Sequence, residues 1–207
     1  MKKRSYLYLL LFMGCCIGWF VLANIKENQA PVPGWSQFGN NQDTGPLFRF
    51  WLPKYYEGVN PQFVTWMIQG AADDFRGEYS SLLDEVKIVF AATDTRTDDA
   101  QPDVFVSYSA LADGPNNPEL ALEEIYSRID KQSNVRLIES ELQSANGYEV
   151  VYLVYDTVFE GLVVRQVQYI IFDGDFKWSV IYMPNKDKYE EDLNIFEQSI
   201  RTFEAKH

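Results

Sequence analysis

The stretch Tyr148-Glu-Val-Val-Tyr-Leu-Val-Tyr155 decides the fold. In a β-strand, successive side chains point to opposite faces of the sheet. Apolar side chains then fall on both faces, with Tyr148, Val150, Tyr152 and Val154 on one and Val151, Leu153 and Tyr155 on the other. A strand that is apolar on both faces is buried on both. The sheet that contains it therefore has a layer of other structure on each side.

Strand and turn signals on either side of this stretch extend the sheet. Asn146-Gly147 is a strong signal for a two-residue hairpin turn, and Asp173-Gly174 marks a second turn further along. Apolar runs between turn residues predict the other strands. The predicted strands are residues 47–51, 86–92, 104–111, 135–143, 148–155, 162–172 and 176–183. We expect them to form a meander of antiparallel strands.

Helices are predicted on the faces of this sheet. Asn117-Pro118 has the form of a helix cap followed by a first-turn proline, and Asn60-Pro61 repeats it. A short helix is expected at residues 73–84. The last helix begins at a capping box of Asp187 and Glu190. Its apolar stripe is Tyr189, Leu193, Phe196, Ile200 and Phe203.

The predicted fold class is therefore α+β. An antiparallel β-sheet meander lies between helices, as an α/β/α sandwich, and one N-terminal transmembrane helix precedes it. Right-handed alternation of parallel strands and helices is not predicted, which disfavours a doubly wound nucleotide-binding fold.

The N-terminal residues predict export. Residues 1–4 contain a basic cluster, which the positive-inside rule keeps in the cytoplasm. Residues 5–25 contain no charge and, as a helix, would span roughly 30 Å, the thickness of a bilayer core. Three alternatives remain: a retained anchor, a signal cleaved after Ala23, or a lipoprotein signal with lipid on Cys15. Each of them places the rest of the chain on the extracytoplasmic side.

Two further segments follow the N-terminal one. Residues 26–46 are rich in Pro, Gly, Asn and Gln and are predicted to be a linker or a loosely docked arm. Trp35 and Phe38 within it are candidates for packing onto the domain or onto a partner. Residues 47–207 are long enough for one exported α+β domain with its own core.

Composition excludes several classes of function. The net charge of −12, from 18 basic and 30 acidic residues, is unsuited to a nucleic-acid binder. The single histidine, His207, leaves no Ser-His-Asp triad and no histidine-rich zinc site. Both cysteines, Cys15 and Cys16, are adjacent and lie in the apolar segment. We predict no catalytic residue and no cofactor.

Acidic residues supply only weak site candidates. A loop rich in aspartate, with Asp94, Asp98, Asp99 and Asp103, offers oxygen ligands that suit Ca²⁺. The loop lacks the glycine and the closing glutamate of a typical calcium loop, so a solvated acidic loop is the simpler interpretation. Adjacent carboxylates at 73–74 and 84–85 point in different directions on a helix, which disfavours an acid/base pair.

Aromatic residues and one arginine are candidates for partner binding. The aromatic cluster near the first predicted strand comprises Trp51, Tyr55, Tyr56 and Trp66. Such a cluster anchors a protein partner, stacks on a sugar, or packs in the core. Arg165 lies within a predicted strand beside Gln166 and Gln168, where a cation requires a carboxylate or an open cleft.

The C-terminal half resembles the PsbP-like group, which shares the Mog1/PsbP α/β/α sandwich. The resemblance covers residues 104–204. It lies in the helix Leu120 to Asp130, the hairpin Asn146-Gly-Tyr-Glu-Val150, the strand Arg165-Gln-Val-Gln-Tyr169 and the helix Phe196 to Phe203. Members of the family often begin with a strand, a proline and a tryptophan, and Phe50-Trp-Leu-Pro53 only approximates that order. The resemblance implies an exported, non-enzymatic accessory domain, like lumenal photosystem subunits and bacterial lipoproteins, and it transfers no functional residue.

These observations favour one function over two alternatives. The first is a non-enzymatic, membrane-anchored accessory or assembly subunit of a larger membrane protein complex, with a photosynthetic complex as one candidate. Its domain would lie in a periplasm, in a thylakoid lumen or at a cell surface. The second is an exported protein that binds a small molecule or a divalent cation. The third is a hydrolase with two catalytic carboxylates, which would require a cleft that contains both.

Overall fold

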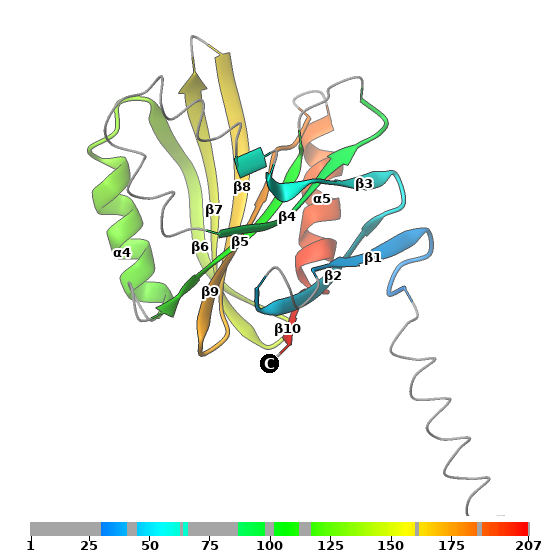
Figure 1. Ribbon diagram of the computed structural model, residues 1–207. Helices are drawn as coiled ribbons and strands as arrows, with labels where there is room; N and C mark the ends of the chain where they lie inside the picture. Colours follow the sequence, from blue (N-terminus) through cyan, green and yellow to red (C-terminus); the bar gives the residue numbers. More distant parts are fainter. Residues whose placement is uncertain are drawn as a thin grey trace, which may run out of the picture. The chain divides into compact units, whose positions relative to one another are not determined.

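The described part of the chain forms two β-sheets, flanked by two helices of 12 residues each (Figure 1). The computed structural model describes residues 30–40, 45–62, 64–65, 87–97, 102–111, 117–159, 162–185 and 188–206. The strands are β1 (Trp35–Gly39), β2 (Leu47–Pro53), β3 (Tyr56–Val59), β4 (Lys87–Asp94), β5 (Val104–Ala110), β6 (Val135–Ala145), β7 (Tyr148–Phe159), β8 (Leu162–Phe172), β9 (Phe176–Tyr182) and β10 (Glu204–Lys206). The helices are α4 (Pro118–Ile129) and α5 (Tyr189–Ile200).

The larger sheet has seven strands in the order β3-β4-β5-β9-β8-β7-β6, and each neighbouring pair is antiparallel. The smaller sheet has the order β1-β2-β10. The antiparallel prediction is confirmed, but the prediction of one continuous meander is wrong. After β5 the chain crosses through α4 to the far edge at β6, and the meander β6-β7-β8-β9 then returns to β5. Strands β5 and β6 therefore run in the same direction.

The hairpin between β6 and β7 has the predicted two-residue turn. Asn146 and Gly147 both have positive φ angles, 49° and 85°, as a type I′ turn requires. Ala145 pairs with Tyr148 at the turn, and the register continues along both strands with one irregularity between Leu137 and Glu139. The Asn-Gly signal therefore fixes the register between β6 and β7.

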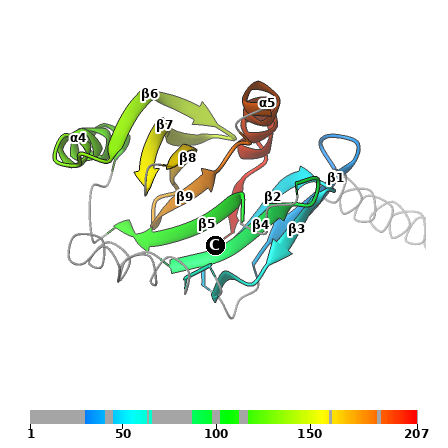
Figure 2. The ribbon, with the colours of Figure 1, turned by 90° about the horizontal axis from the view of Figure 1, so that it is seen from above.

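Strand β7 is buried on both faces, as its sequence predicts. Residues Val150 to Val154 are all buried. On one face, Val151 and Leu153 pack with Ala121 of α4. On the other face lies the main core, which α5 and strand β2 of the small sheet cover. Figure 2 shows α4 on one side of the large sheet and α5 with the small sheet on the other. The predicted layer on each face is confirmed.

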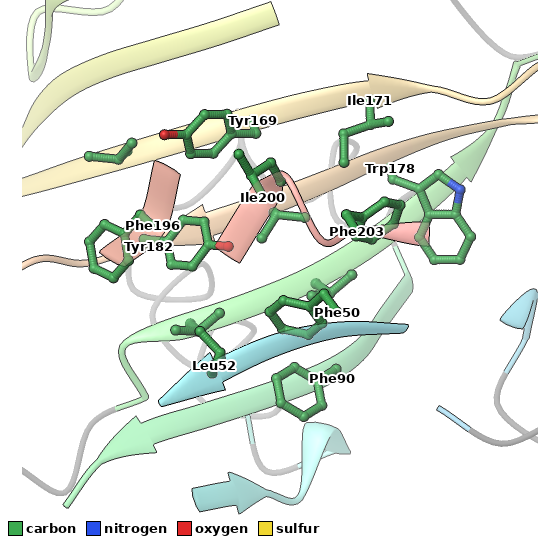
Figure 3. Close-up of a cluster of buried hydrophobic side chains, with 14 of the residues drawn as sticks. Phe50, Leu52, Phe90, Tyr169, Ile171, Trp178, Tyr182, Phe196, Ile200 and Phe203 are labelled. Atoms are coloured by element: carbon green, nitrogen blue, oxygen red, sulfur yellow. The ribbon is translucent and has the colours of Figure 1, made fainter. Parts of the chain in front are cut away.

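The main core is rich in aromatic side chains (Figure 3). Trp178 of β9 is fully buried and packs against Phe48 and Phe203 at centroid distances of 5.4 and 5.6 Å. Phe196 of α5 stacks on Tyr182 at 4.2 Å. The apolar stripe predicted for the last helix thus faces the sheet, although the helix ends at Ile200 and Phe203 lies beyond it.

The helix caps agree with the sequence at one helix and differ at the other. The Asn117 side chain accepts a hydrogen bond from the backbone N–H of Leu120 and caps α4, as predicted. Helix α5 instead has Lys188 at its N-cap, with no hydrogen bond from a capping side chain. The helix therefore begins one residue later than predicted, and Asp187, the predicted cap, lies outside the described residues.

The N-terminal boundary of the domain also differs from the prediction. Residues 26–46 were expected to be a linker or a loosely docked arm. Within them, Trp35–Gly39 form β1 and pair with β2. The folded unit begins at Trp35 rather than at Leu47. The predicted membrane segment, residues 5–25, lies outside the described residues. Within the described residues, no helix has the length and hydropathy needed to cross a bilayer.

Candidate functional site

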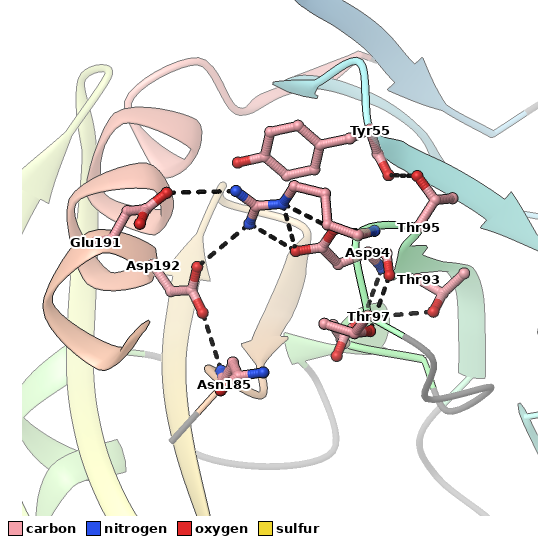
Figure 4. Close-up of polar contacts among 10 residues, drawn as sticks. Tyr55, Thr93, Asp94, Thr95, Thr97, Asn185, Glu191 and Asp192 are labelled. Carbon is pink, nitrogen blue, oxygen red and sulfur yellow. Dashed lines mark hydrogen bonds and ion pairs between the residues drawn. The ribbon is translucent and has the colours of Figure 1, made fainter. Parts of the chain in front are cut away.

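Among the described residues, a group of charged side chains from three segments surrounds Arg96 (Figure 4). Arg96 lies in the turn that follows β4. Tyr55 reaches it from the turn between β2 and β3, and Glu191 and Asp192 reach it from the first turn of α5. We name this group, with Asp94 and Asp103, the Arg96 cluster. It joins three segments that are far apart in the sequence.

Both carboxylate oxygens of Asp94 accept hydrogen bonds from the guanidinium group of Arg96. Its Oδ2 accepts hydrogen bonds from Nη2 and Nε of Arg96 at 2.6 and 3.0 Å, and its Oδ1 accepts one from Nε at 3.0 Å. The aromatic ring of Tyr55 stacks on the guanidinium group, with its centroid 3.6 Å from Cζ. Burial acts to raise the pKa of Asp94, but the hydrogen bonds from Arg96 outweigh it and hold this pKa below its usual value.

Helix α5 supplies the other two carboxylates. Nη1 of Arg96 lies 3.3 Å from Oε1 of Glu191, and Nη2 lies 3.6 Å from Oδ1 of Asp192. Asp192 is buried, and its Oδ2 accepts the backbone N–H of Asn185 at 2.9 Å. Its Oδ1 has no hydrogen-bond partner. Burial raises the pKa of Asp192, because the distant guanidinium group compensates only in part for the loss of water.

Asp103 contacts the cluster through the backbone of Asp94. Its Oδ2 accepts hydrogen bonds from the backbone N–H of Asp94 at 2.6 Å and from the Thr93 hydroxyl at 3.4 Å. Burial raises the pKa of Asp103 to about 6. Asp103 therefore lies close to half-protonation at a mildly acidic pH.

The contacts of the cluster suit a structural role, in which Arg96 joins α5 to the turns that follow β2 and β4. Each of the three guanidinium nitrogens contacts a carboxylate, so Arg96 is committed to internal contacts. Asp94 and Asp103, two of the predicted metal ligands, are likewise occupied by internal donors. The other two, Asp98 and Asp99, lie outside the described residues. Among the residues that the structure describes, no group of three metal-ligating side chains is arranged to hold an ion.

We expect Asp103 to make stability depend on pH in an unusual direction. Its pKa is higher in the folded chain than the unfolded value of 3.8, so the folded state binds more protons between about pH 4 and 6 and loses stability as the pH rises through that range. Asp103→Asn keeps an oxygen acceptor and removes the buried charge. The variant should gain on the order of 1 kcal/mol over the wild type at pH 7.5 and much less at pH 4. Urea unfolding at both pH values measures this, and an equal difference at both would contradict it.

The predicted aromatic cluster is divided by the fold. Tyr56 is buried in the main core, and Tyr55 lies beside it at a centroid distance of 5.2 Å while it stacks on Arg96. Trp51 is half-buried on β2, and Trp66 lies outside the described residues. Trp35 is buried in the small sheet. These placements favour packing roles for Trp35, Tyr55 and Tyr56.

Phe38 and Arg165 also have partners within the domain. Phe38 packs against Phe90 at a centroid distance of 5.5 Å. Arg165 of β8 donates to Asp156 of the neighbouring strand β7 at 2.8 and 3.0 Å and lies 5.2 Å above the ring of Tyr189. The carboxylate that the sequence argument required for Arg165 is therefore Asp156. Cys15, the candidate lipidation site, lies outside the described residues.

Sequence reasoning missed Arg96, Glu191 and Asp192. The close spacing of Asp94 and Arg96 was a usable signal, since a carboxylate and a guanidinium group two residues apart can pair across a turn. Nothing in the sequence connects either residue to the start of α5, which is 95 residues away from Arg96.

Comparisons with known proteins identify the fold. No protein-family model matches the chain, and no curated protein does. Among solved structures, the solution structure of cyanobacterial PsbP (CyanoP) from Synechocystis sp. PCC 6803 matches 86% of this chain and 95% of its own, with 12% identity and a TM-score of 0.55. The domain has the PsbP-like fold.

A second PsbP-like match comes from a different kind of cell. LpqN of Mycobacterium tuberculosis, described as involved in cell envelope biogenesis, matches 84% of this chain and 92% of its own, with 10% identity and a TM-score of 0.51. The predicted PsbP-like domain is thus confirmed. The match covers more of the chain than residues 104–204, to which the sequence resemblance was limited.

Proposed function

We propose that this PsbP-like domain is a non-enzymatic accessory or assembly module that binds a larger membrane protein complex on the extracytoplasmic side. Residues 5–25 would tether it to the membrane. The fold supports this role, since one of its structural neighbours takes part in cell envelope biogenesis. The apolar, uncharged N-terminal segment behind a basic cluster supports export.

The distribution of exposed apolar side chains is the observation that supports this proposal most strongly. Six large apolar residues of the described part are exposed, by 40% to 57% of their surface. All of them lie on α4, β6 and the end of the hairpin between β7 and β8: Leu120, Tyr126, Ile138, Leu142, Val158 and Val163. Among described residues, α5 and the small sheet expose none. Leu142 lies on the α4 side of the sheet, on the same face as Ser140, which is hydrogen-bonded to the exposed Tyr126. Exposed apolar side chains on one side of a sheet are typical of an interaction surface.

Affinity purification of the full-length chain from its native membranes tests the proposal. In mild detergent, we expect a membrane protein complex to be recovered in a fixed ratio to the chain, because the accessory role requires a stable contact. A harsh detergent that separates membrane complexes should release the chain alone. Recovery of a monomer at every mild-detergent concentration would contradict the proposed function.

A further inference from the structure

Strand β6 forms an unusually long free edge of the large sheet. It occupies one end of the strand order, and β7 is its one strand neighbour in the described part of the chain (Figure 2). The strand has 11 residues, whereas β3 at the opposite edge has 4. A long open edge presents unpaired backbone groups that pair readily with another extended segment.

The turn that precedes β7 determines which backbone groups of β6 are free. In a two-residue hairpin, the residues that flank the turn form a hydrogen-bonded pair, and hydrogen-bonded and non-hydrogen-bonded pairs then alternate. Since Ala145 pairs with Tyr148 at this turn, the backbones of residues 145, 143 and 141 face β7. The N–H and C=O groups of Ser140, Leu142 and Ser144 therefore point away from β7, to the free edge.

The side chains of β6 differ between the two faces of the sheet. On the α4 side, Leu142 is exposed, and Ser140 is hydrogen-bonded to the hydroxyl of the exposed Tyr126 at 2.7 Å. On the α5 side, Glu139 and Glu141 lie opposite Val154 and Tyr152 of β7 and are exposed. One face of the edge is thus partly apolar, and the other carries two carboxylates two residues apart.

We propose that β6 binds an extended segment of a partner protein in which basic residues alternate with apolar ones. The segment adds an eighth strand to the sheet. Its backbone pairs with residues 140, 142 and 144, its basic side chains lie beside Glu139 and Glu141, and its apolar side chains contact Leu142. Opposite charges across neighbouring strands stabilise their pairing. A second copy of this chain is the less suitable occupant, because two chains of net charge −12 repel one another.

The direct test is a titration of the full-length chain in mild detergent with a short peptide of alternating Lys and Val. Amide hydrogen exchange is measured at each residue of β6. We expect saturable binding that slows exchange at residues 140, 142 and 144, while a peptide of alternating Glu and Val binds at least ~10-fold more weakly. Binding that leaves these three amides unprotected, or equal binding of both peptides, would overturn the proposal.

Two variants locate the contact. Leu142→Pro removes one outward N–H and no hydrogen bond to β7, so an edge strand accommodates it. It should weaken the binding of the Lys-Val peptide by about 10-fold or more. Leu142→Ala keeps the N–H and should change the affinity by less than about 3-fold. If the proline variant does not fold, the charge-reversed double variant Glu139→Lys, Glu141→Lys replaces it. That variant should prefer the Glu-Val peptide, and an unchanged preference would count against the proposal.

This inference rests on the proposed function, but the two can fail separately. If wild-type chain recovers a membrane complex and Leu142→Pro recovers it equally well, the β6 contact is wrong and the accessory role stands. If neither recovers a complex, the accessory role itself fails. Dimerisation of the wild type that Leu142→Pro abolishes would instead show that a second copy occupies the edge, and would refute the basic partner.

Discussion

Replacing Arg96 with leucine will lower the free energy of unfolding by about 2–4 kcal/mol at pH 7. The substitution leaves the buried carboxylates of Asp94 and Asp192 without their cation, and burying an uncompensated charge is costly. The cost should shrink as the pH falls below about 4. Arg96 holds the pKa of Asp94 below its usual value, so that stabilisation is present above the unfolded pKa and is lost as the pH falls. Urea unfolding across this pH range measures both effects.

Two control variants make the result for Arg96 specific. Arg128→Leu removes an arginine from an exposed ion pair with Glu124 on α4 and should cost less than about 0.5 kcal/mol. The double variant Arg96→Leu, Asp94→Asn removes both charges of the ion pair. Its loss in free energy of unfolding should therefore be smaller than the sum of the losses of the two single variants. If Arg96→Leu lowers the free energy of unfolding no more than Arg128→Leu does, the Arg96 cluster does not stabilise the fold.

Truncation of Trp178 to alanine will produce the other large loss, about 3–5 kcal/mol. The Trp178 ring is fully buried between Phe48 and Phe203, and its indole N–H donates to Oδ2 of Asp173 at 2.6 Å. The substitution removes this packing and leaves a cavity where strand β9 meets the small sheet. Thermal unfolding followed by circular dichroism measures the loss.

Val163→Ala supplies the comparison for this core substitution. Val163 is a large apolar residue with 57% of its surface exposed, so its truncation should change the free energy of unfolding by less than about 0.5 kcal/mol. Similar losses at Trp178 and Val163 would show that the aromatic core of Figure 3 does not hold the sheets together.

Local signals in the sequence predicted the parts of the fold that depend on local geometry. The Asn146-Gly147 dipeptide fixed a hairpin because few turns other than type I′ suit it, and the apolar residues of β7 indicated two covered faces. The place of β9 beside β5 was not predictable in this way. That pairing joins segments about 70 residues apart, and no local pattern records which strand follows β5 in the sheet.

The candidate site likewise depends on long-range contacts that no local sequence pattern records. The aspartates at 94 and 103 were recognised as a group, but their chemistry depends on neighbours from elsewhere in the chain. Arg96 lies two residues from Asp94, whereas Glu191 and Asp192 reach the cluster only because α5 packs on the sheet. The sequence left open whether Trp35 packs onto the domain or onto a partner, and the pairing of β1 with β2 places it within the domain.

Photo-crosslinking in living cells tests most directly the central claim that this domain works by contact with a membrane protein. A photoreactive amino acid is placed at Leu142 on the free edge or, as a control, at the exposed Lys54 between β2 and β3. The account predicts that Leu142 forms one dominant adduct with a membrane protein and that Lys54 forms none. The absence of an adduct from Leu142, with the chain remaining a monomer, would contradict it.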